Sequence, residues 1–360
     1  MSVDFVTNQE IIMAARRNLN QNVWDYLTGG AESETTMRRN RLALDSLAFR
    51  PRVLIDVSKI DTAAAFLGHK LRIPVMLAPI GSLQSLVPEG GVAVAKAAAE
   101  FGTVNFVSSV TQPTLEEIAS ASPNPKVFQL YVQGDMKWVA DILGRVKQAG
   151  YKALCLTVDT AYYGRRERQL MDRWLPPSLR GNQAQRHYRA ALTWEIMDAI
   201  KEMAGLPFIL KGVATAEDAE IAVKHGVQAV YISNHGGRQL DHGRGTIEAL
   251  PEIVAAVGGK AEIVLDGGIT RGTDILKAIV LGARAVAIGK LQGWGLAAAG
   301  EAGLVRVLEL LENEITITMG LLGVRSLAEL NPKHVCKAAP VAPAHEMSAF
   351  PHIPGGRITT

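Results

Sequence analysis

The chain has 360 residues, 48% hydrophobic and 20% charged, a composition typical of an ordered globular protein with one large α/β domain or two smaller ones. Its net charge is only +3 and no cluster of Lys and Arg is interleaved with aromatic residues, so we expect no nucleic-acid partner. The two cysteines, Cys155 and Cys336, are too few for a disulfide framework and lack zinc spacing, so we expect a cytoplasmic protein without a metal site. No stretch resembles a signal-peptide core or reaches the roughly 20 apolar residues of a membrane span, so we expect no membrane contact.

Residues 1–72 are interpreted as helical segments followed by a short extended piece that could close the bottom of a barrel. From about residue 73 one plan repeats: a short apolar run, a loop and a helical pattern. Because continuous apolar strands that alternate with helices indicate a parallel sheet covered on both faces, eight repeats predict a closed (β/α)8 TIM barrel, with a doubly wound open sheet as the alternative. The eight strand candidates are Ile73–Ala78, Val104–Val107, Val127–Val132, Ala153–Val158, Pro207–Leu210, Ala229–Ile232, Glu262–Leu265 and Ala285–Ile288.

Two helix starts and two irregular segments complete this plan. Residues 114–117 (TLEE) are typical of a capping box, and residues 215–218 (TAED) are a weaker relative of it. The fourth interval is about twice as long as the others, so residues 160–192 are interpreted as an insertion that forms an active-site lid. Residues 331–360 are rich in Pro and His and are expected to form a loose tail. We therefore predict a single domain over residues 1–360, with the barrel at 73–330.

Polar or glycine residues stand where each predicted strand ends. In a parallel barrel all these positions converge on one face, which is the face that carries the active site in such folds. Capping alone does not explain polar groups at all eight strand ends, because unpaired buried polar groups are costly. These residues are Pro79-Ile80-Gly81, Ser108-Ser109, Gln129 with Tyr131, Thr157 with Asp159, Lys211, Ser233 with His235, Asp266-Gly267-Gly268 and Gly289-Lys290.

The most informative of these loops is residues 233–241 (SNHGGRQLD), which follow an apolar run. It places an imidazole, His235, and a guanidinium, Arg238, three residues apart, and the two glycines between them allow a tight turn. An imidazole can move a proton while a guanidinium binds a carboxylate in a two-pronged contact. The alternative is an ordinary polar turn. The loop therefore favours a small acid substrate.

The loops after the seventh and eighth strands have the chemistry of a phosphate site. Residues 266–272 (DGGITRG) offer bare backbone N–H groups, a hydroxyl and a guanidinium just before a helix start. Gly289-Lys290 adds a second cation. A pair of plain glycine turns is the alternative, but the phosphate site of such barrels commonly lies after strands seven and eight.

Over about residues 20–330 the sequence resembles the FMN-dependent α-hydroxy acid oxidases and dehydrogenases, the group of glycolate oxidase, lactate oxidase and mandelate dehydrogenase. The resemblance implies FMN as cofactor, a small-molecule 2-hydroxy acid as substrate and a homo-oligomer, a tetramer in this family. Its motifs are Asp25-Tyr26 with Gly30-Ala31, Phe49-Arg50-Pro51-Arg52, Phe128-Gln129-Leu130-Tyr131, Leu156-Thr157-Val158-Asp159, Gly164-Arg165-Arg166, Leu210-Lys211-Gly212, the loop at 233–239 and Asp266-Gly267-Gly268.

The resemblance also implies a role for each site residue. His235 would take a proton from the substrate and Asp159 would stabilise the imidazolium. Arg166 and Arg238 would hold the carboxylate, and Tyr26 and Tyr131 would orient carboxylate and hydroxyl. The implied cofactor-binding residues are Pro79, Ile80, Gly81, Ser108, Gln129, Thr157, Lys211, Ser233, Asp266, Gly267, Gly268, Thr270, Arg271, Gly289 and Lys290.

Three departures from the family pattern bear on the cofactor. Thr270 replaces the first of two usual arginines, and Lys290 replaces an arginine and so keeps the charge but loses the fork, which predicts weaker FMN binding. Gly81 stands where many of the oxidases have alanine, which leaves open whether O2 or another acceptor reoxidises the flavin. An FMN-dependent isomerase or a non-catalytic flavin-binding scaffold remains the alternative function.

A further substitution concerns substrate choice. The short-chain glycolate oxidases have a tryptophan at the position of Val110, so the resemblance implies a wider, apolar pocket here, with Ile80 and Leu83 nearby. Because burial of each methylene contributes about 0.8 kcal/mol, we expect aromatic or medium aliphatic 2-hydroxy acids to be preferred to glycolate. Trp174 of the insertion could fill the same space instead.

Overall fold

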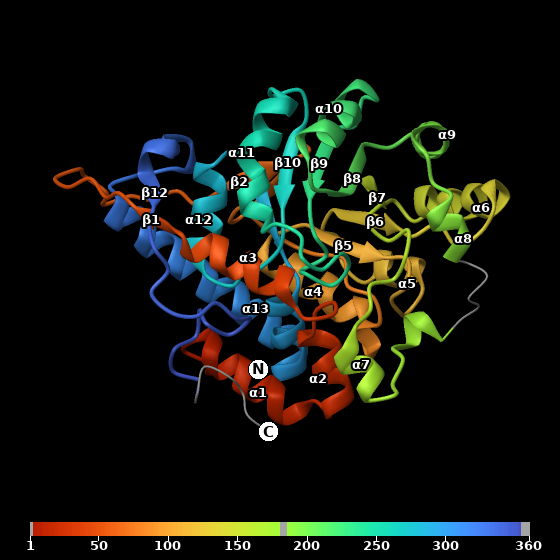
Figure 1. The fold of residues 1–360 in the computed structure, drawn as a ribbon, viewed down its shortest axis with the longest axis horizontal. Coiled ribbons are helices and arrows are strands. Elements are labelled where there is room, and N and C mark those ends of the chain that lie inside the picture. The colour runs from red at the N-terminus through yellow and green to blue at the C-terminus, as the bar shows by residue number, and fades with distance from the viewer. Residues whose placement is uncertain (1–2, 181–185, 354–360) are drawn as a thin grey trace.

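The protein forms a closed barrel of eight parallel strands, seen near the centre of Figure 1 in a computed structural model that describes residues 3–180 and 186–353. The predicted TIM barrel is therefore confirmed, and the open sheet is wrong. The last three strands have the predicted bounds, and the others differ by up to three residues at either end. The strands are β4 (Val75–Leu77), β5 (Asn105–Ser108), β6 (Lys126–Leu130), β7 (Ala153–Thr157), β8 (Phe208–Val213), β9 (Ala229–Ile232), β10 (Glu262–Leu265) and β11 (Ala285–Ile288).

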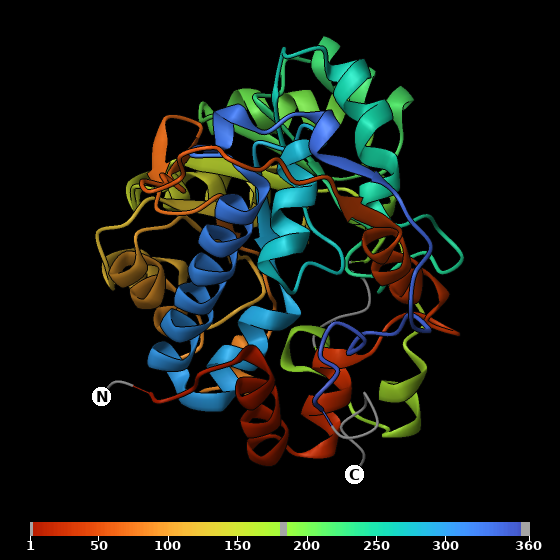
Figure 2. The same ribbon diagram turned by 90° about the vertical axis from the view of Figure 1, so that its left-hand side faces the viewer.

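Helices follow the strands and cover the outside of the barrel. The predicted cap at Thr114 is a complete capping box, and the Thr215 side chain accepts a hydrogen bond from Asp218 N. The long helix α13 runs beside the barrel in Figure 2 and is kinked at Ala299 and Gly300, whose backbone angles are not helical. The helices after the strands are α4 (Gly91–Phe101), α5 (Leu115–Ser120), α6 (Met136–Gln148), α9 (Trp194–Ala204), α10 (Ala216–Lys224), α11 (Thr246–Val257), α12 (Gly272–Val280) and α13 (Lys290–Leu322).

The N-terminal extension contains three helices, α1 (Asn8–Asn18), α2 (Gln21–Thr28) and α3 (Thr35–Asp45), and the strand β1 (Leu47–Phe49). A hairpin of β2 (Ala64–Phe66) and β3 (His69–Leu71) follows them. Phe66 and Leu71 of this hairpin are buried in the apolar cluster that fills the barrel, and Leu67 N donates to Glu262 at the start of β10. The hairpin therefore covers the end of the barrel where the strands begin.

The insertion after β7 contains α7 (Glu167–Met171), a 3-10 turn at Pro177–Leu179 and α8 (Arg186–Ala190). Residues 181–185 of the predicted lid lie outside the described residues. Trp174 packs against Tyr26 with ring centroids 5.7 Å apart, and it is not among the residues that line the pocket beside Val110.

The prediction of a loose tail after Pro332 is wrong for residues 335–337 and 347–353, whereas residues 339–343 are exposed and contain no helix or strand. Strand β12 (Val335–Lys337) pairs antiparallel with β1, and 3-10 turns occupy Leu327–Glu329 and Pro332–His334. Three apolar side chains of this region pack against the body of the protein, and their burial stabilises the position of the chain there: Met347, Phe350 and Ile353. Residues 354–360 of the predicted tail lie outside the described residues.

Candidate active site

A large pocket lies at the carboxyl ends of the barrel strands, where the sequence predicts the site. It brings together residues from the N-terminal extension, the strand ends, the insertion and the C-terminal segment. Fifteen of the predicted site residues line it: Tyr26, Pro79, Ile80, Gly81, Tyr131, Arg166, Lys211, His235, Arg238, Asp266, Gly267, Gly268, Thr270, Gly289 and Lys290.

His235 occupies a strained position in the loop after β9. Its φ of 59° is in the left-handed region, which is uncommon for a residue with a side chain, and its backbone N–H donates to Ser233 Oγ at 3.0 Å. The imidazole Nδ1 lies 3.1 Å from Asp159 Oδ2, and Nε2 lies 3.3 Å from the Tyr131 hydroxyl. The loop therefore presents one ring nitrogen to a carboxylate and directs the other toward the pocket.

The charges around His235 favour a neutral imidazole beside an ionised carboxylate. Burial lowers the pKa of His235 below its ordinary value, although Asp159 acts in the opposite direction. Burial would raise the pKa of Asp159, but His235 and Lys211 together hold that pKa below its ordinary value. A neutral imidazole can accept a proton, and the carboxylate can stabilise the cation that results.

Two guanidinium groups face the same space. Arg238 donates to the carbonyl oxygen of Tyr26 at 2.6 Å and lies over the Tyr26 ring at 5.1 Å. Arg166 Nε donates to the Arg238 carbonyl at 3.2 Å. Burial and the neighbouring Arg166 lower the pKa of Arg238 to about 10, so the pair is a site of concentrated positive charge. Tyr26 is fixed by a hydrogen bond from its hydroxyl to Gly81 O at 2.8 Å. The two guanidinium groups of Arg166 and Arg238 are suited to bind a carboxylate.

Buried polar side chains lie beside the pocket on neighbouring strands. Lys211 Nζ donates to Ser233 Oγ at 2.9 Å and lies 3.7 Å from Asp266, to which Ser233 also donates at 2.6 Å. Burial would lower the pKa of Lys211, but Asp266 and Asp159 raise it above its ordinary value. The lysine is therefore a fixed cation at the barrel mouth.

The predicted pyrimidine-edge residues provide a test of whether the site fits a flavin. Gln129 Nε2 donates to Thr157 Oγ1 at 2.9 Å, while Gln129 Oε1 is buried without a hydrogen-bond partner among the described residues. Ser108 is paired with Gln129 across β5 and β6. A buried acceptor without a donor is costly, and the N–H of a flavin pyrimidine ring is such a donor. Together with the cation at Lys211, this set fits FMN.

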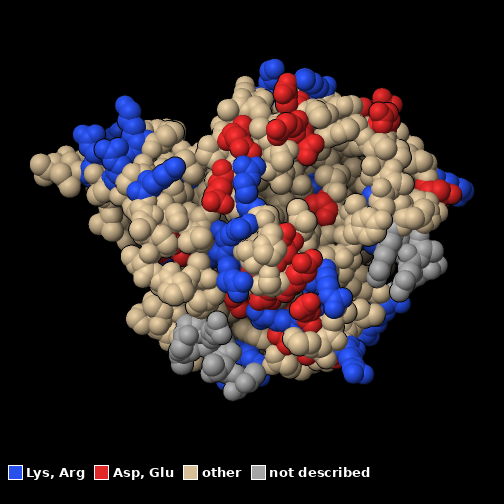
Figure 3. All heavy atoms as spheres, in the orientation of Figure 1, with Lys and Arg blue, Asp and Glu red and all other residues tan. Residues whose placement is uncertain are grey.

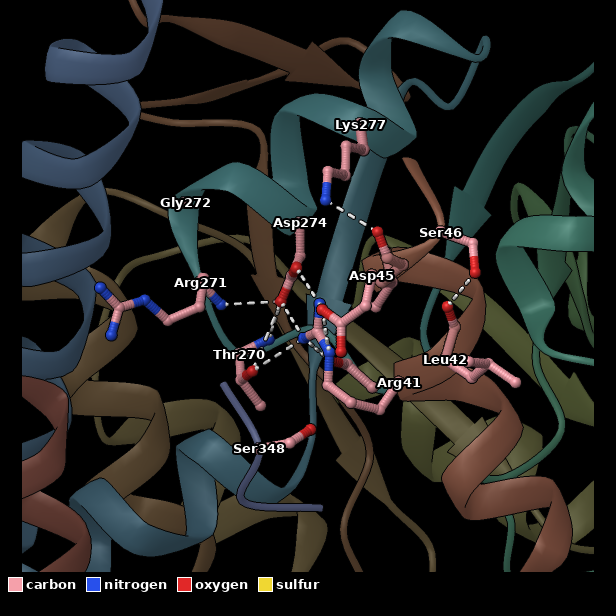
Figure 4. A network of polar contacts seen from close by, with 12 residues as sticks. Arg41, Leu42, Asp45, Ser46, Thr270, Arg271, Gly272, Asp274, Lys277 and Ser348 are labelled. Carbon is pink, nitrogen blue, oxygen red and sulfur yellow. Dashed lines mark hydrogen bonds and ion pairs between the residues drawn. The ribbon is translucent and has the colours of Figure 1, made fainter. Parts of the chain in front are cut away.

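The predicted phosphate end is closed by a network around Asp274, shown in Figure 4. Arg41 of α3 binds Asp274 with contacts of 2.7 and 2.8 Å, and the backbone N–H groups of Thr270 and Arg271 each donate to Asp274 at 3.0 Å. Gly268 has a φ of 80° and lies so close to α3 that a Cβ would come within 3.0 Å of Asn40. The network holds the loop after β10 against the N-terminal extension.

The two cations predicted for the phosphate are placed differently. Lys290 lines the pocket and donates to the carbonyl oxygen of Thr28, and burial lowers its pKa to about 7. Arg271 does not line the pocket: it pairs with Glu314 at 3.0 Å and points away from the Asp274 network in Figure 4. Its implied role as a phosphate ligand is therefore not supported by its position.

Several pocket residues were not predicted from the sequence. Asn40 exchanges hydrogen bonds with Asn234 at 2.7 and 3.0 Å and so braces the His235 loop. Gln133 and Arg189 line the space near Tyr131, and the Arg189 guanidinium lies 5.7 Å from the centre of the Tyr131 ring. The only sequence signal for Gln133 and Arg189 as pocket residues is that Gln133 lies near a strand end and Arg189 lies in the insertion. The pocket wall is consequently less apolar than predicted.

Gly81 and Val110 are coupled by their packing. A Cβ at Gly81 would lie 2.8 Å from Val110 Cγ2, closer than real Cβ contacts, so a side chain at 81 requires Val110 to move. Both residues line the pocket beside Ile80, whereas Leu83 is buried and is absent from the lining.

Among the described residues there is no cluster of three His, Cys, Asp or Glu side chains suited to a metal ion. In the same ranges no helix has the length and apolarity needed to cross a bilayer.

Comparison with known proteins gives a consistent result. The family described as FMN-dependent dehydrogenase matches residues 15–337. Glycolate oxidase 1 of Zea mays is 40% identical over 96% of this chain and 98% of its own length, and an L-lactate oxidase of Nostoc sp. is 40% identical over 88% and 94%. A crystal structure of mandelate oxidase, 37% identical, superposes with a TM-score of 0.86 over 94% of this chain and all of that one.

Proposed function

Because the chain belongs to the family of FMN-dependent dehydrogenases, we propose that His235, Asp159, Arg166, Arg238, Tyr26 and Tyr131 are the catalytic groups of a 2-hydroxy acid oxidase. The reaction is the oxidation of an (S)-2-hydroxy acid to the 2-oxo acid. Bound FMN supplies the two-electron acceptor, which O2 or another acceptor then reoxidises. The observation that carries the assignment is the placement of His235, its carboxylate partner and two arginines around one pocket.

The substrate carboxylate would bind between Arg166 and Arg238, which both line the pocket and whose positive charges act on each other. The substrate hydroxyl would then lie near Tyr131 and His235 Nε2, which are already within 3.3 Å of each other. His235 is neutral and can accept a proton there, and Asp159 would stabilise the imidazolium. Lys211 would hold negative charge near the flavin pyrimidine edge.

The test is anaerobic reduction of the purified yellow protein by a panel of 2-hydroxy acids. Bleaching of the flavin by any of them supports this assignment and excludes an isomerase or a scaffold without a redox role. The kcat/KM values for glycolate, lactate, 2-hydroxyoctanoate and mandelate then rank the substrates. We propose that the larger acids lead, because the small side chain of Val110 lines the pocket together with Ile80, whereas Trp174 is not among the lining residues. If glycolate ranks first, the wide-pocket argument is wrong.

The assembly and location of the protein are also proposals. A cytoplasmic homo-oligomer fits the family resemblance and the small number of cysteines. An exposed apolar patch supports the assembly: Val53, Leu54, Ile317 and Leu321 are all exposed, and Arg52 N donates to Leu322 O, which joins the two segments. Such a patch is typical of an interface between subunits.

A further inference from the structure

The C-terminal segment, residues 345–353, is docked beside the phosphate end of the pocket. Phe350 is fully buried and packs edge-on against Trp294, which lines the pocket, with ring centroids 6.4 Å apart. The backbone N–H of His352 donates to Gln9 of α1 at 2.8 Å. Arg271 lies over the Phe350 ring at 5.6 Å. Apolar burial and polar contacts thus fix the segment in this place.

This segment brings a carboxylate into the pocket. Glu346 lines the pocket and lies 3.3 Å from Arg168 of α7, which also pairs with Glu34. Burial would raise the pKa of Glu346, but the charges of Lys290 and Arg168 hold that pKa below its ordinary value, so the side chain is ionised.

The cations at the same end already have carboxylate partners. Arg41 pairs with Asp274 and Asp45, Arg168 pairs with Glu34, and Arg271 pairs with Glu314 outside the pocket. Lys290 lines the pocket at this end, and among the neighbouring charges Glu346 acts on it most strongly. An incoming phosphate therefore meets a nearly balanced set of charges that includes one anion on the C-terminal segment.

We propose that residues 345–353 form the outer wall of the cofactor pocket and that the Glu346 carboxylate there weakens the binding of the FMN phosphate. The inference rests on the proposed placement of the phosphate between the loop after β10 and Lys290. Like charges in a partly buried site repel, so the carboxylate would weaken the binding of the phosphate by about tenfold.

The experiment compares the full-length protein with Glu346→Gln, each loaded with FMN or with riboflavin, which lacks the phosphate. Dissociation constants are measured from the fluorescence of the flavin released on dilution. We expect Glu346→Gln to bind FMN about tenfold more tightly and to bind riboflavin within twofold of the parent protein. Ser348→Ala is the matched control, because it alters the same segment without a change of charge: the Ser348 hydroxyl donates to His345 O and accepts from His345 N, both within the segment. It should leave both constants unchanged.

Unchanged or weaker FMN binding in Glu346→Gln would overturn the proposal. An equal change for both flavins would overturn it too, because the effect would then act through the fold of the segment. A thermal unfolding midpoint measured for each flavin-loaded variant shows whether the segment remains docked. No hydroxy acid is present in these measurements, so their failure leaves the proposed reaction standing, and that reaction is tested separately by anaerobic reduction.

Discussion

His235 has a strained backbone and a side chain of fixed orientation. Its role as proton acceptor can be tested separately from cofactor binding. It bonds to Asp159 and Tyr131, and its backbone bonds to Ser233. We expect His235→Ala to retain FMN and to reduce it at least about 100-fold more slowly, because the proton acceptor is lost. Flavin content and the anaerobic reduction rate measure the two effects. A variant that reduces FMN at a near-native rate would remove His235 from the mechanism.

The pH dependence of the reaction is expected to follow from the interaction between His235 and Asp159. The pKa of His235 lies below its ordinary value, so the acid limb of the kcat/KM profile, where acid protonates the imidazole, should have its midpoint below about pH 6.5. Asp159 acts to raise that pKa. Asp159→Asn should therefore move the acid limb of the kcat/KM profile to lower pH and reduce kcat, because the imidazolium loses its partner. An acid limb that moves to higher pH would contradict the assignment.

Lys211 is a buried cation at the barrel mouth, with contacts to Ser233 and Asp266. Replacement by Met removes the charge with little change in length. We expect Lys211→Met to lower the flavin reduction potential and to slow reduction by roughly 100-fold, because charge on the reduced ring loses its partner. Potentiometric titration of flavin-loaded protein checks the first effect. Equal potentials and rates in the two proteins would place this lysine outside the cofactor site.

At the level of single residues, the sequence predicts the site well where a motif sits at a strand end. His235, Lys211 and Gly268 fall in short glycine-rich or apolar-then-polar patterns that place them at the barrel mouth. Asn40 and Arg189 could not be predicted in this way, because their positions depend on how the N-terminal extension and the insertion dock. Arg271 shows the opposite error: its motif points to phosphate, but a carboxylate on α13 binds it instead.

Among the elements, the loop after β9 and helix α3 are held together by a contact that only glycine permits. Gly237 has a φ of 76°, and a Cβ there would lie 2.5 Å from Met37 N in α3. Gly237→Ala should destabilise the protein by about 2–4 kcal/mol and displace the His235 loop. Thermal unfolding and FMN retention test this.

Gly144 in α6 is the matched control for that substitution. A Cβ at Gly144 meets nothing within 4 Å, and its φ is that of an ordinary helix, so Gly144→Ala should leave stability unchanged or raise it by up to about 1 kcal/mol. A similar loss of stability in both variants would show that the contact with α3 is unimportant.

The predicted elements were accurate where periodicity decides them and wrong where composition misleads. Strands such as β9, β10 and β11 are short apolar runs between glycine-containing turns, and their bounds match the prediction. The C-terminal segment contains prolines and histidines, which are typical of loose tails. Its apolar residues Met347, Phe350 and Ile353 recur every three positions and are buried, and that spacing was the signal that composition concealed.

For the molecule as a whole, the repeated alternation of strand and helix was enough to predict the barrel, because few other folds bury eight continuous apolar strands. The arrangement of the extension, the insertion and the C-terminal segment over the barrel mouth was not predictable. These segments have no repeat, and each is positioned by tertiary contacts such as that between Arg41 and Asp274.

The surface of the whole molecule bears on its assembly. Leu54 is fully exposed and Leu321 is 73% exposed, and both belong to the apolar patch of residues 53, 54, 317 and 321. The segment that carries Leu54 projects at the left of Figure 1, and in Figure 3 its tip is uncharged. Burial of two such leucines in each subunit contributes several kcal/mol to an interface.

We therefore expect the double variant Leu54→Asp with Leu321→Asp to shift the proposed oligomer toward the monomer, because a charge buried in an interface is costly. Light scattering coupled to gel filtration measures the mass. Val6→Asp is the control, since Val6 is also exposed but lies outside the patch. If the double variant keeps the mass of the parent oligomer, the subunits meet through another surface; if the parent protein is itself a monomer, the apolar patch has a different partner.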